Sequence, residues 1–289
     1  MPATLIDGKA IAAAIRDDVA RRAAALKAAG RPASLVAILI GDDPAALSYS
    51  ASQAKSAAAV GIDYRLDQLP AGTTQPQALA AIDQLNRDRH ITGIMVHVPA
   101  PKPLDSFALQ QRIAPEKDVE GVNAACLGLL ALGRDAPVPC TAAAAFACLK
   151  STGVEIAGKH AVVIGRSAIV GKPLAMLLLN ANATVTQCHT KTRDLAAHTR
   201  RADILFAAAG VPHLIGHEHI SPGAIVIDVG TNRIPLEDGS GKTKMVGDVQ
   251  FDSVKELASF LTPVPGGVGP VTVATLLANT VAAAERHGV

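Results

Sequence analysis

A glycine-rich turn between an apolar run and a helical pattern holds the residues best suited to binding a ligand. Residues 161–173 read A-V-V-I-G-R-S-A-I-V-G-K-P, where the apolar run ends at Gly165 and a helical pattern resumes at Gly171. A strand, a tight turn and a helix start in this order direct unpaired backbone N–H groups and the positive end of a helix dipole at an anion. The spacing is a looser form of the dinucleotide-binding pattern G-x-G-x-x-G. We therefore predict that this turn binds the phosphates of a dinucleotide.

Arg166 lies inside the turn and narrows the choice of cofactor. A guanidinium group binds a phosphate through two parallel hydrogen bonds, which suits the additional ribose phosphate of NADP. Glycine-rich turns also occur in unrelated loops, so the arginine adds specificity to the pattern. We expect NADP rather than NAD as the cofactor.

The overall composition argues against several classes of protein. The 289 residues carry a net charge of +2 with no basic block, and aromatic residues make up 2% of the chain. A nucleic acid or an anionic membrane surface is therefore not an expected partner. The four cysteines form no C-x-x-C pair and the N-terminus shows no secretory pattern, which favours a cytoplasmic protein with reduced thiols. Prolines and glycines interrupt the charge-free stretch 257–284, so no membrane span is expected.

Apolar runs typical of strands alternate with helical patterns along most of the chain. This alternation predicts an α/β fold with parallel sheets and crossover helices. In the first half, we expect strands over 34–40, 63–69 and 93–98 and helices over about 10–29, 45–60 and 77–87. Turn-forming residues dominate 115–133, which is expected to be a loop, and Thr141 is the expected N-cap of an alanine-rich helix. In the second half, we expect strands over 160–164, 184–187, 204–208 and 224–229 and a last helix over about 271–286.

Several motifs, taken together, resemble those of one enzyme family. The second half contains V-V-I-G-R-S-A-I-V-G-K-P (162–173), A-D-I-L (202–205), I-D-V-G (227–230), G-D-V (247–249) and L-T-P-V-P-G-G-V-G-P-V-T (261–272). The first half contains G-D-D-P-A (41–45), V-G-I (60–62), P-E-K-D-V (115–119) and C-T (140–141). By these motifs the chain is identified as a member of the FolD family, the bifunctional methylenetetrahydrofolate dehydrogenases/methenyltetrahydrofolate cyclohydrolases.

The resemblance implies a fold, a cofactor and a partner. It implies an N-terminal α/β domain that binds folate and carries the catalytic residues, over 1–139 and 271–289. It also implies a Rossmann-type NADP-binding domain over 140–270, with the last helix returning to the first domain. The substrates would be one-carbon derivatives of tetrahydrofolate. Because members of the family are typically homodimers, a homodimer is expected.

The resemblance also assigns roles to individual residues. Gly165, Arg166 and Ser167 would bind the cofactor phosphates, and Thr190 would lie near the ribose phosphate. Thr231 would lie near the cofactor, at a position that is more often isoleucine in the family. The residues expected to contact the folate substrate, the last two also bordering the nicotinamide, are Tyr49, His97, Val98, Pro99, Glu120, Pro265 and Gly266.

The chain departs from the family pattern at three polar positions of the expected active site. Family members carry a tyrosine and, four residues later, a catalytic lysine; here Tyr49 is followed by Gln53. Lys55 does not substitute, because it lies about 120° around the helix from the tyrosine. His97 stands where the family has a glutamine that assists the lysine. Glu120 replaces an aspartate that binds the amino edge of the pterin.

These departures affect the two reactions of the family differently. Dehydrogenation moves a hydride to the nicotinamide and depends mainly on alignment of the two rings. Cyclohydrolysis adds water and breaks a C–N bond, so protons must be moved by a group that titrates. Gln53 does not titrate near neutral pH. We therefore predict an NADP-dependent methylenetetrahydrofolate dehydrogenase whose cyclohydrolase activity is weakened or lost, with Tyr49, Gln53, His97 and Glu120 as its catalytic residues.

Two alternatives remain open. An imidazole with a pKa of about 6.5 is a suitable general base, so His97 could carry the protons of a fully bifunctional enzyme. The altered residues also fit a paralogue that binds folate or a dinucleotide without turnover. No metal site is expected: His213, His217 and His219 have no nearby cysteine or paired carboxylate motif and are interpreted as surface residues.

Overall fold

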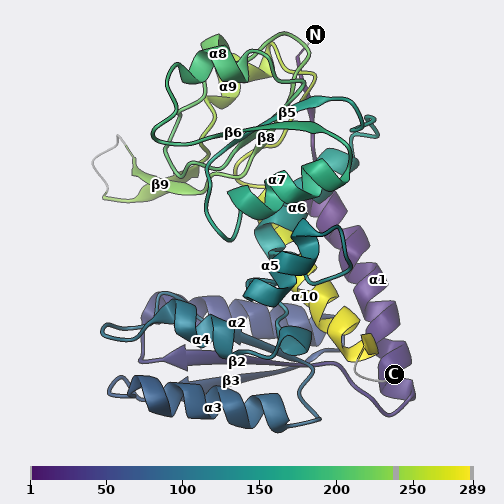
Figure 1. The fold of residues 1–289 in the computed structure, drawn as a ribbon, viewed down its shortest axis with the longest axis vertical. Helices are drawn as coiled ribbons and strands as arrows, with labels where there is room; N and C mark the ends of the chain where they lie inside the picture. Colours follow the sequence, from purple (N-terminus) through teal and green to yellow (C-terminus); the bar gives the residue numbers. More distant parts are fainter. Residues whose placement is uncertain (1, 237–240, 287–289) are drawn as a thin grey trace. The chain divides into compact units, whose positions relative to one another are not determined.

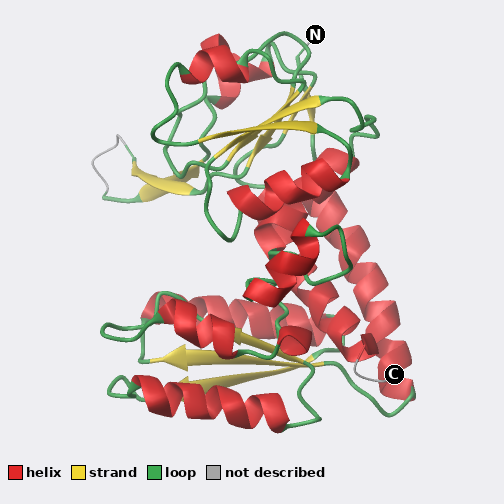
Figure 2. Cartoon of the chain, viewed as in Figure 1, coloured by secondary structure: helices red, strands yellow, loops and turns green. Residues whose placement is uncertain are grey.

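The computed structural model describes residues 2–236 and 241–286, which pack as two compact units (Figure 1). The three-stranded unit comprises Ala14–Val138 and Leu276–Val289, and the six-stranded unit comprises Met1–Ala13 and Pro139–Thr275. Both units combine strands with helices, as expected for an α/β chain (Figure 2).

The three-stranded unit is built on a parallel sheet with the strand order β3-β2-β4. The strands expected over 34–40 and 63–69 are confirmed, whereas the third strand ends two residues earlier than expected. The sheet consists of β2 (Ser34–Ile40), β3 (Asp63–Leu69) and β4 (Gly93–Val96). The main helices of the unit are α2 (Pro44–Ala59), α3 (Gln75–Arg87) and α4 (Ser106–Arg112).

Alternate residues of the central strand separate the two faces of this sheet. Val36 and Ile38 of β2 belong to one apolar cluster with Ile82 of α3 and Leu109 of α4. Successive side chains of a strand point to opposite faces. Residues 35, 37 and 39 therefore face the opposite side, where α2 contacts β3 and the side chain of Met95.

The start of α2 is set by local sequence. Pro44 occupies the first helical turn, where its missing N–H leaves no hydrogen bond unmade. The Asp43 side chain accepts a hydrogen bond from the backbone N–H of Ala45 at 3.2 Å. This cap fixes the beginning of the helix that carries Tyr49 and Gln53.

The prediction of a loop over 115–133 was wrong in part, because the segment contains the short 3-10 helix η1 (Pro115–Lys117) and the helix α5 (Ala124–Ala131). Asn123 is the N-cap of α5, and its side chain accepts a hydrogen bond from the N–H of Ala125 at 2.9 Å. The Asp118 carboxylate in turn accepts the N–H of Asn123 at 2.7 Å. The polar residues that suggested a loop are therefore the ones that start the helix.

The six-stranded unit contains a parallel sheet with the order β1-β11-β8-β7-β5-β6. Its four longer strands fall where the sequence predicts them, within one or two residues. The strands are β1 (Thr4–Leu5), β5 (His160–Ile164), β6 (Thr184–Cys188), β7 (Ile204–Ala207), β8 (Ile225–Asp228) and β11 (Phe260–Leu261). Residues 2–13, which include β1 and its pairing with β11, belong to this unit, whereas the sequence-based domain bounds group them with 14–139.

Short helices and an antiparallel strand pair complete the six-stranded unit. They are α6 (Cys140–Lys150), α7 (Gly171–Asn180), α8 (Leu195–Thr199), η2 (His217–His219), α9 (Phe251–Lys255), and the pair β9 (Asn232–Pro235) and β10 (Thr243–Val246). The prediction that Thr141 caps the alanine-rich helix was wrong. The N-cap of α6 is Pro139, whose carbonyl accepts the N–H of Ala143 at 2.9 Å, so Thr141 lies within the first turn.

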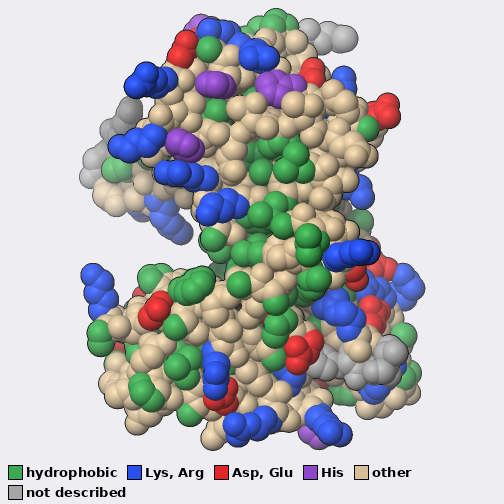
Figure 3. All heavy atoms as spheres, viewed as in Figure 1, with side chains coloured by type: hydrophobic (Ala, Val, Ile, Leu, Met, Phe, Trp, Pro, Cys, Tyr) green, Lys and Arg blue, Asp and Glu red, His purple; other side chains and the backbone are tan. Residues whose placement is uncertain are grey.

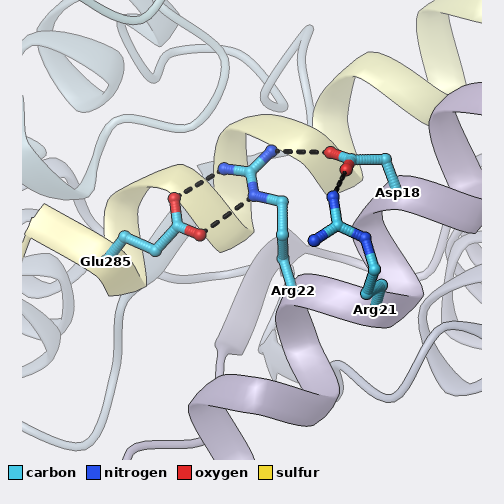
Figure 4. A network of polar contacts seen from close by, with 4 residues as sticks. All are labelled: Asp18, Arg21, Arg22 and Glu285. Carbon is cyan, nitrogen blue, oxygen red and sulfur yellow. Dashed lines mark hydrogen bonds and ion pairs between the residues drawn. The ribbon is translucent and has the colours of Figure 1, made fainter.

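Two long helices, α1 (Gly8–Ala28) and α10 (Val268–Arg286), contribute residues to both units. Within the three-stranded unit their ends are joined by Arg22 (Figure 4). Its guanidinium donates to both carboxylate oxygens of Glu285, at 2.9 and 2.6 Å, and to Asp18 at 3.2 Å. Asp18 also pairs with Arg21. The first and last helices of the chain are thereby held together at their distal ends.

α10 is long and apolar enough to cross a membrane, by length and composition alone. Of its most apolar 18-residue window, 56% is buried inside the structure. Burial of this extent is the pattern of a core helix of a folded domain.

Candidate active site

Tyr49 and His97 form the open side of a cluster between α2 and the end of β4. Their ring centroids lie 6.1 Å apart and their planes meet at 83°. Gln53 follows Tyr49 by one helical turn, and Met95 precedes His97 on the same face of the sheet. The side chains of Gln53 and Met95 are also in contact. Two pairs of side chains, one from each turn of the helix, therefore connect α2 to the strand β4 and the residue that follows it.

Gln53 is enclosed by neutral groups. Its side chain is 3% exposed, its Nε2 lies 3.5 Å from the Met95 sulfur, and its Oε1 accepts a hydrogen bond from the Tyr64 hydroxyl at 3.5 Å. Lys55 is exposed to solvent, on a different side of the helix. Position 53 is thus occupied by an amide with uncharged partners.

His97 contributes an imidazole that is partly buried. Its backbone N–H donates to the carbonyl of Ile38 at 2.9 Å, which extends the sheet pairing one residue beyond β4. Among the described residues, no group hydrogen-bonds its buried Nε2 atom. Burial lowers the pKa of His97, so the ring is neutral near neutral pH. A neutral imidazole with an unengaged nitrogen can accept a proton.

Glu120 approaches the same end of β4 from a neighbouring segment. An isolated parallel bridge pairs Ile94 with Asp118, and this register places Glu120 beside Val96. Its Oε2 atom is buried and meets no hydrogen-bonding partner within residues 2–236 and 241–286. Burial, and then the nearby Asp118 carboxylate, raise the pKa of Glu120 to about 8. At neutral pH the side chain is a carboxylic acid that can donate a proton.

Asp118 holds the segment that presents Glu120. Its carboxylate accepts backbone N–H groups from Glu120, Gly121 and Asn123 at 3.1, 2.9 and 2.7 Å. Gly121 has a φ of +68°, and a Cβ there would lie 2.5 Å from the carbonyl carbon of Val138. The conformation of this turn therefore requires glycine.

Val98 and Pro99 follow His97 on the open side of the cluster. Val98 is 45% exposed and Pro99 is exposed, whereas the next residue, Ala100, is buried. Together with Tyr49, which is 47% exposed, they offer apolar surface beside the polar groups. All the residues that the resemblance assigned to the substrate in this unit lie at the carboxyl end of β4 or on the facing helix.

The predicted dinucleotide turn is present between β5 and α7 of the six-stranded unit. Gly165 has a φ of +110°, and a Cβ there would lie 2.1 Å from the carbonyl oxygen of Ala208. A Cβ at Gly171 would lie 2.1 Å from the carbonyl oxygen of Gly165. The Ser167 hydroxyl accepts the N–H of Val170 at 3.1 Å, just before the helix begins. The turn therefore has the close backbone approach that anion binding at a helix N-terminus requires.

The other predicted cofactor residues follow the carboxyl ends of strands in the same sheet. Arg166 is exposed within the turn, and Thr190 is exposed after β6. Thr231, after β8, lines a cavity of about 330 Å³ together with Pro265 and Gly266. Lys9 of α1 also lines this cavity. Ligands of open parallel sheets bind at this edge.

Sequence reasoning did not single out a pair of buried aspartates that shape this edge. The Asp228 carboxylate accepts backbone N–H groups from Gly230, Asp248 and Val249. The Asp248 carboxylate accepts the N–H of Ala209 at 2.6 Å and of Gly210 at 2.9 Å, and the side-chain amide of Asn232 at 2.8 Å. Burial raises the pKa of Asp228 to about 7. The motifs I-D-V-G and G-D-V contain this pair, and an aspartate within two residues of a glycine in each was the available signal.

No group of three or more potential metal ligands occurs in the part of the chain that the structure describes. Histidine side chains lie at the surface of the six-stranded unit (Figure 3), and both His213 and His217 are exposed. The interpretation of His219 as a surface residue was wrong. It is half-buried, and its Nδ1 lies 3.2 Å from the backbone nitrogen of Gly216 and 2.9 Å from a carboxylate oxygen of Glu218.

Two family models match the chain. Residues 6–120 match the catalytic domain, and residues 139–288 match the NAD(P)-binding domain, of tetrahydrofolate dehydrogenase/cyclohydrolase. The bifunctional protein FolD of Brevibacillus brevis is 48% identical over 287 residues, with 99% of each chain covered.

Solved structures agree with these matches. The bifunctional methylenetetrahydrofolate dehydrogenase/cyclohydrolase FolD of Campylobacter jejuni has a TM-score of 0.93 and 42% identity, over 98% of this chain and 99% of that one. The FolD enzyme of Trypanosoma brucei, solved with NADP and an inhibitor, has a TM-score of 0.92 and 40% identity, over 99% and 98% of the two chains.

Proposed function

The chain belongs to the tetrahydrofolate dehydrogenase/cyclohydrolase family, and we propose that it oxidises methylenetetrahydrofolate with NADP and hydrolyses the methenyl product, using His97 for proton transfer. The observation that carries this proposal is the buried, unengaged Nε2 of a neutral imidazole beside Tyr49. This histidine supplies a titrating group where the lysine of the family is absent.

The dehydrogenase step requires two bound rings rather than a proton carrier. The turn at Gly165, with Arg166 and Ser167, would bind the phosphates of NADP, and Thr190 would lie near the ribose phosphate. Thr231, Pro265 and Gly266 line the cavity proposed to receive the nicotinamide end of the cofactor and the neighbouring part of the folate. Hydride transfer then depends on holding the methylene carbon against the nicotinamide.

The hydrolytic step requires protons to move to and from the folate nitrogen and the attacking water. The neutral His97 would take a proton from water, and the protonated Glu120 would donate hydrogen bonds to the pterin or a proton to its nitrogen. Two groups with pKa values displaced in opposite directions from their usual ranges are the arrangement expected of an acid–base site.

A second candidate function is dehydrogenation with weakened or lost hydrolysis. The enclosure of Gln53 by Tyr64 and Met95 favours it, because neither the amide nor its partners carry a charge. A lysine at this position would supply an ammonium group close to the substrate. Here that electrostatic contribution is missing, and a positioned acid or base typically contributes about 10²–10⁴-fold to a rate.

Parallel assays of the two reactions on parent protein and His97→Gln decide between these functions. With His97 as proton carrier, the parent hydrolyses methenyltetrahydrofolate faster than buffer does, and the variant loses about 10²-fold or more of that rate while still producing NADPH. The matched control is His90→Gln, an exposed histidine of the same unit, which should leave both rates unchanged. Parent and variant hydrolysing equally fast would contradict the role of His97. Folate binding with neither NADPH formation nor hydrolysis above the rate in buffer would contradict catalysis altogether.

Family membership also supports a domain assignment and an assembly. We assign folate binding to the three-stranded unit, within the sequence-based bounds 1–139 and 271–289, and NADP binding to residues 140–270. We further propose a homodimer located in the cytoplasm. Light scattering of the purified protein tests the dimer, and cell fractionation tests the location.

A further inference from the structure

Tyr64 joins the active-site helix to the edge strand β3. The register Leu35↔Tyr64 places its side chain on the sheet face that α2 covers. Its hydroxyl lies 2.7 Å from the Ser50 hydroxyl and donates to Gln53 Oε1 at 3.5 Å. A phenol has one proton, so when it donates to Gln53 its oxygen accepts from Ser50. The three side chains form a directed chain from Ser50 through Tyr64 to Gln53.

This chain, together with Met95, fixes which end of the Gln53 amide faces which way. A thioether sulfur accepts a hydrogen bond but cannot donate one. The Nε2 group of Gln53 therefore belongs on the Met95 side and the carbonyl on the Tyr64 side, as the two 3.5 Å contacts show. One N–H of the amide points to the sulfur, and the second N–H is the group left for a ligand.

We propose that Tyr64 is a positioning residue that holds the Gln53 amide so that position 53 acts on the folate substrate only as a hydrogen-bond donor. A lysine ammonium is a donor in every orientation, whereas an amide is a donor at one end and an acceptor at the other. With its carbonyl engaged by Tyr64, Gln53 retains the donor property of a lysine without its charge. The inference rests on the proposed function, because it takes the folate to bind beside Tyr49 and His97.

The test is Tyr64→Phe, which keeps the ring and removes the hydroxyl. The KM for methylenetetrahydrofolate should rise about 3- to 10-fold, the effect of one misdirected hydrogen bond, while kcat and the KM for NADP stay within twofold. Ser50→Ala should produce a smaller rise in the same constant. The matched control is Ser56→Ala on the same helix, whose hydroxyl donates to the Ser52 carbonyl at 2.9 Å, and it should change nothing.

Double variants separate positioning from a merely structural role. In the Gln53→Lys background the ammonium donates in every orientation, so adding Tyr64→Phe should leave the KM for folate unchanged. In the Gln53→Leu background there is no donor to orient, so adding Tyr64→Phe should again leave this KM unchanged. An equal effect of Tyr64→Phe in all three backgrounds overturns the proposal. A lower kcat, a higher KM for both substrates and a lower unfolding temperature, all in Tyr64→Phe, would also overturn it, because they indicate a general structural defect.

Calorimetry compares the dissociation constants for tetrahydrofolate of the parent and of Tyr64→Phe in the absence of turnover. A parent that binds tetrahydrofolate but forms no NADPH overturns the proposed function alone. Equal dissociation constants for the parent and Tyr64→Phe overturn the role of Tyr64 alone. A parent that does not bind tetrahydrofolate overturns both.

Discussion

The imidazole of His97 meets the ring of Tyr49 edge-on, with centroids 6.1 Å apart and planes at 83°. One ring extends from a capped helix and the other from the residue that follows a buried strand, so both are held by regular elements. The orientation of the histidine is therefore set before any ligand binds, as a proton carrier requires.

The hydrolysis rate should show the pKa of His97. Because burial lowers this pKa from the ordinary 6.5, the base stays neutral to a lower pH than an exposed histidine does. On its acidic side, the pH profile of kcat/KM for methenyltetrahydrofolate should therefore stay flat down to pH 6.5 and fall only below it. On its basic side, the rate should fall as Glu120 loses its proton, at about pH 8. In His97→Gln the acidic limb should disappear. An acidic limb centred above 6.5 would contradict the assignment of His97 as the base.

Gln53→Lys tests how much hydrolytic activity is lost because position 53 is not a lysine. The new ammonium would lie beside the Met95 sulfur and the Tyr64 hydroxyl, which are the groups that Gln53 contacts. Neither group carries a negative charge that could pair with the ammonium. We expect the free energy of unfolding to fall by about 3–5 kcal/mol, from burial of an incompletely paired charge. The ratio of hydrolysis to dehydrogenation should rise about tenfold or more. Both activities and urea unfolding measure this.

The control for that substitution is Gln53→Met, which fills similar space without a charge. It should lower stability less and leave the activity ratio at or below that of the parent. If Gln53→Lys and Gln53→Met give the same ratio, the pocket no longer responds to an ammonium group at this position. The second candidate function would then lose its physical basis.

Strongly patterned elements could be predicted from the sequence, whereas contacts set by pairing could not. β2 and β3 fall on the predicted residues because seven-residue apolar or alternating runs carry their own signal. β1 and β11 have two residues each and exist because β1 pairs with β11 and β11 pairs with β8. A strand of two residues is too short to show a periodic pattern of apolar residues in the sequence.

The same distinction applies to the site. The substitution at position 53 can be recognised from the sequence, and so can the glycines of the dinucleotide turn. The contact of Gln53 with Tyr64 is not, because it depends on the register that brings β3 beside β2 and under α2. Glu120 was identified by resemblance, but its protonation follows from burial beside Asp118, which only the folded chain shows.

Glu120 should make the protein less stable as the pH rises. Its pKa is about 8 in the folded protein and 4.5 in the ordinary reference state. Between these values the folded state binds more protons than the unfolded state, so the free energy of unfolding falls with increasing pH. Glu120→Gln should reduce this slope, leaving the part that the raised pKa of Asp228 contributes, and should be more stable than the parent at pH 8. Urea unfolding at pH 5 and pH 8 measures the effect.

The control for Glu120 is Glu116→Gln, an exposed carboxylate of the preceding turn. It should keep the slope of the parent, because its charge is solvated in both states. Identical slopes in the parent and Glu120→Gln would show that the carboxyl ionises normally in the folded protein. Its proposed role as a neutral hydrogen-bond donor would then be wrong.

Arg166 should determine the preference for NADP over NAD. The residue is exposed in the turn between β5 and α7, whose backbone is fixed by Gly165 and Ser167, so its guanidinium is available to a phosphate at the proposed site. Arg166→Gln removes a charge-assisted hydrogen bond to the additional ribose phosphate and should raise the dissociation constant for NADP about 10- to 100-fold. NAD lacks that phosphate, so its dissociation constant should change less than threefold. Lys150→Gln, at the exposed end of α6, is the matched loss of a positive charge and should leave both constants unchanged. Equal weakening of NADP and NAD by Arg166→Gln would assign the arginine to the shared phosphates instead.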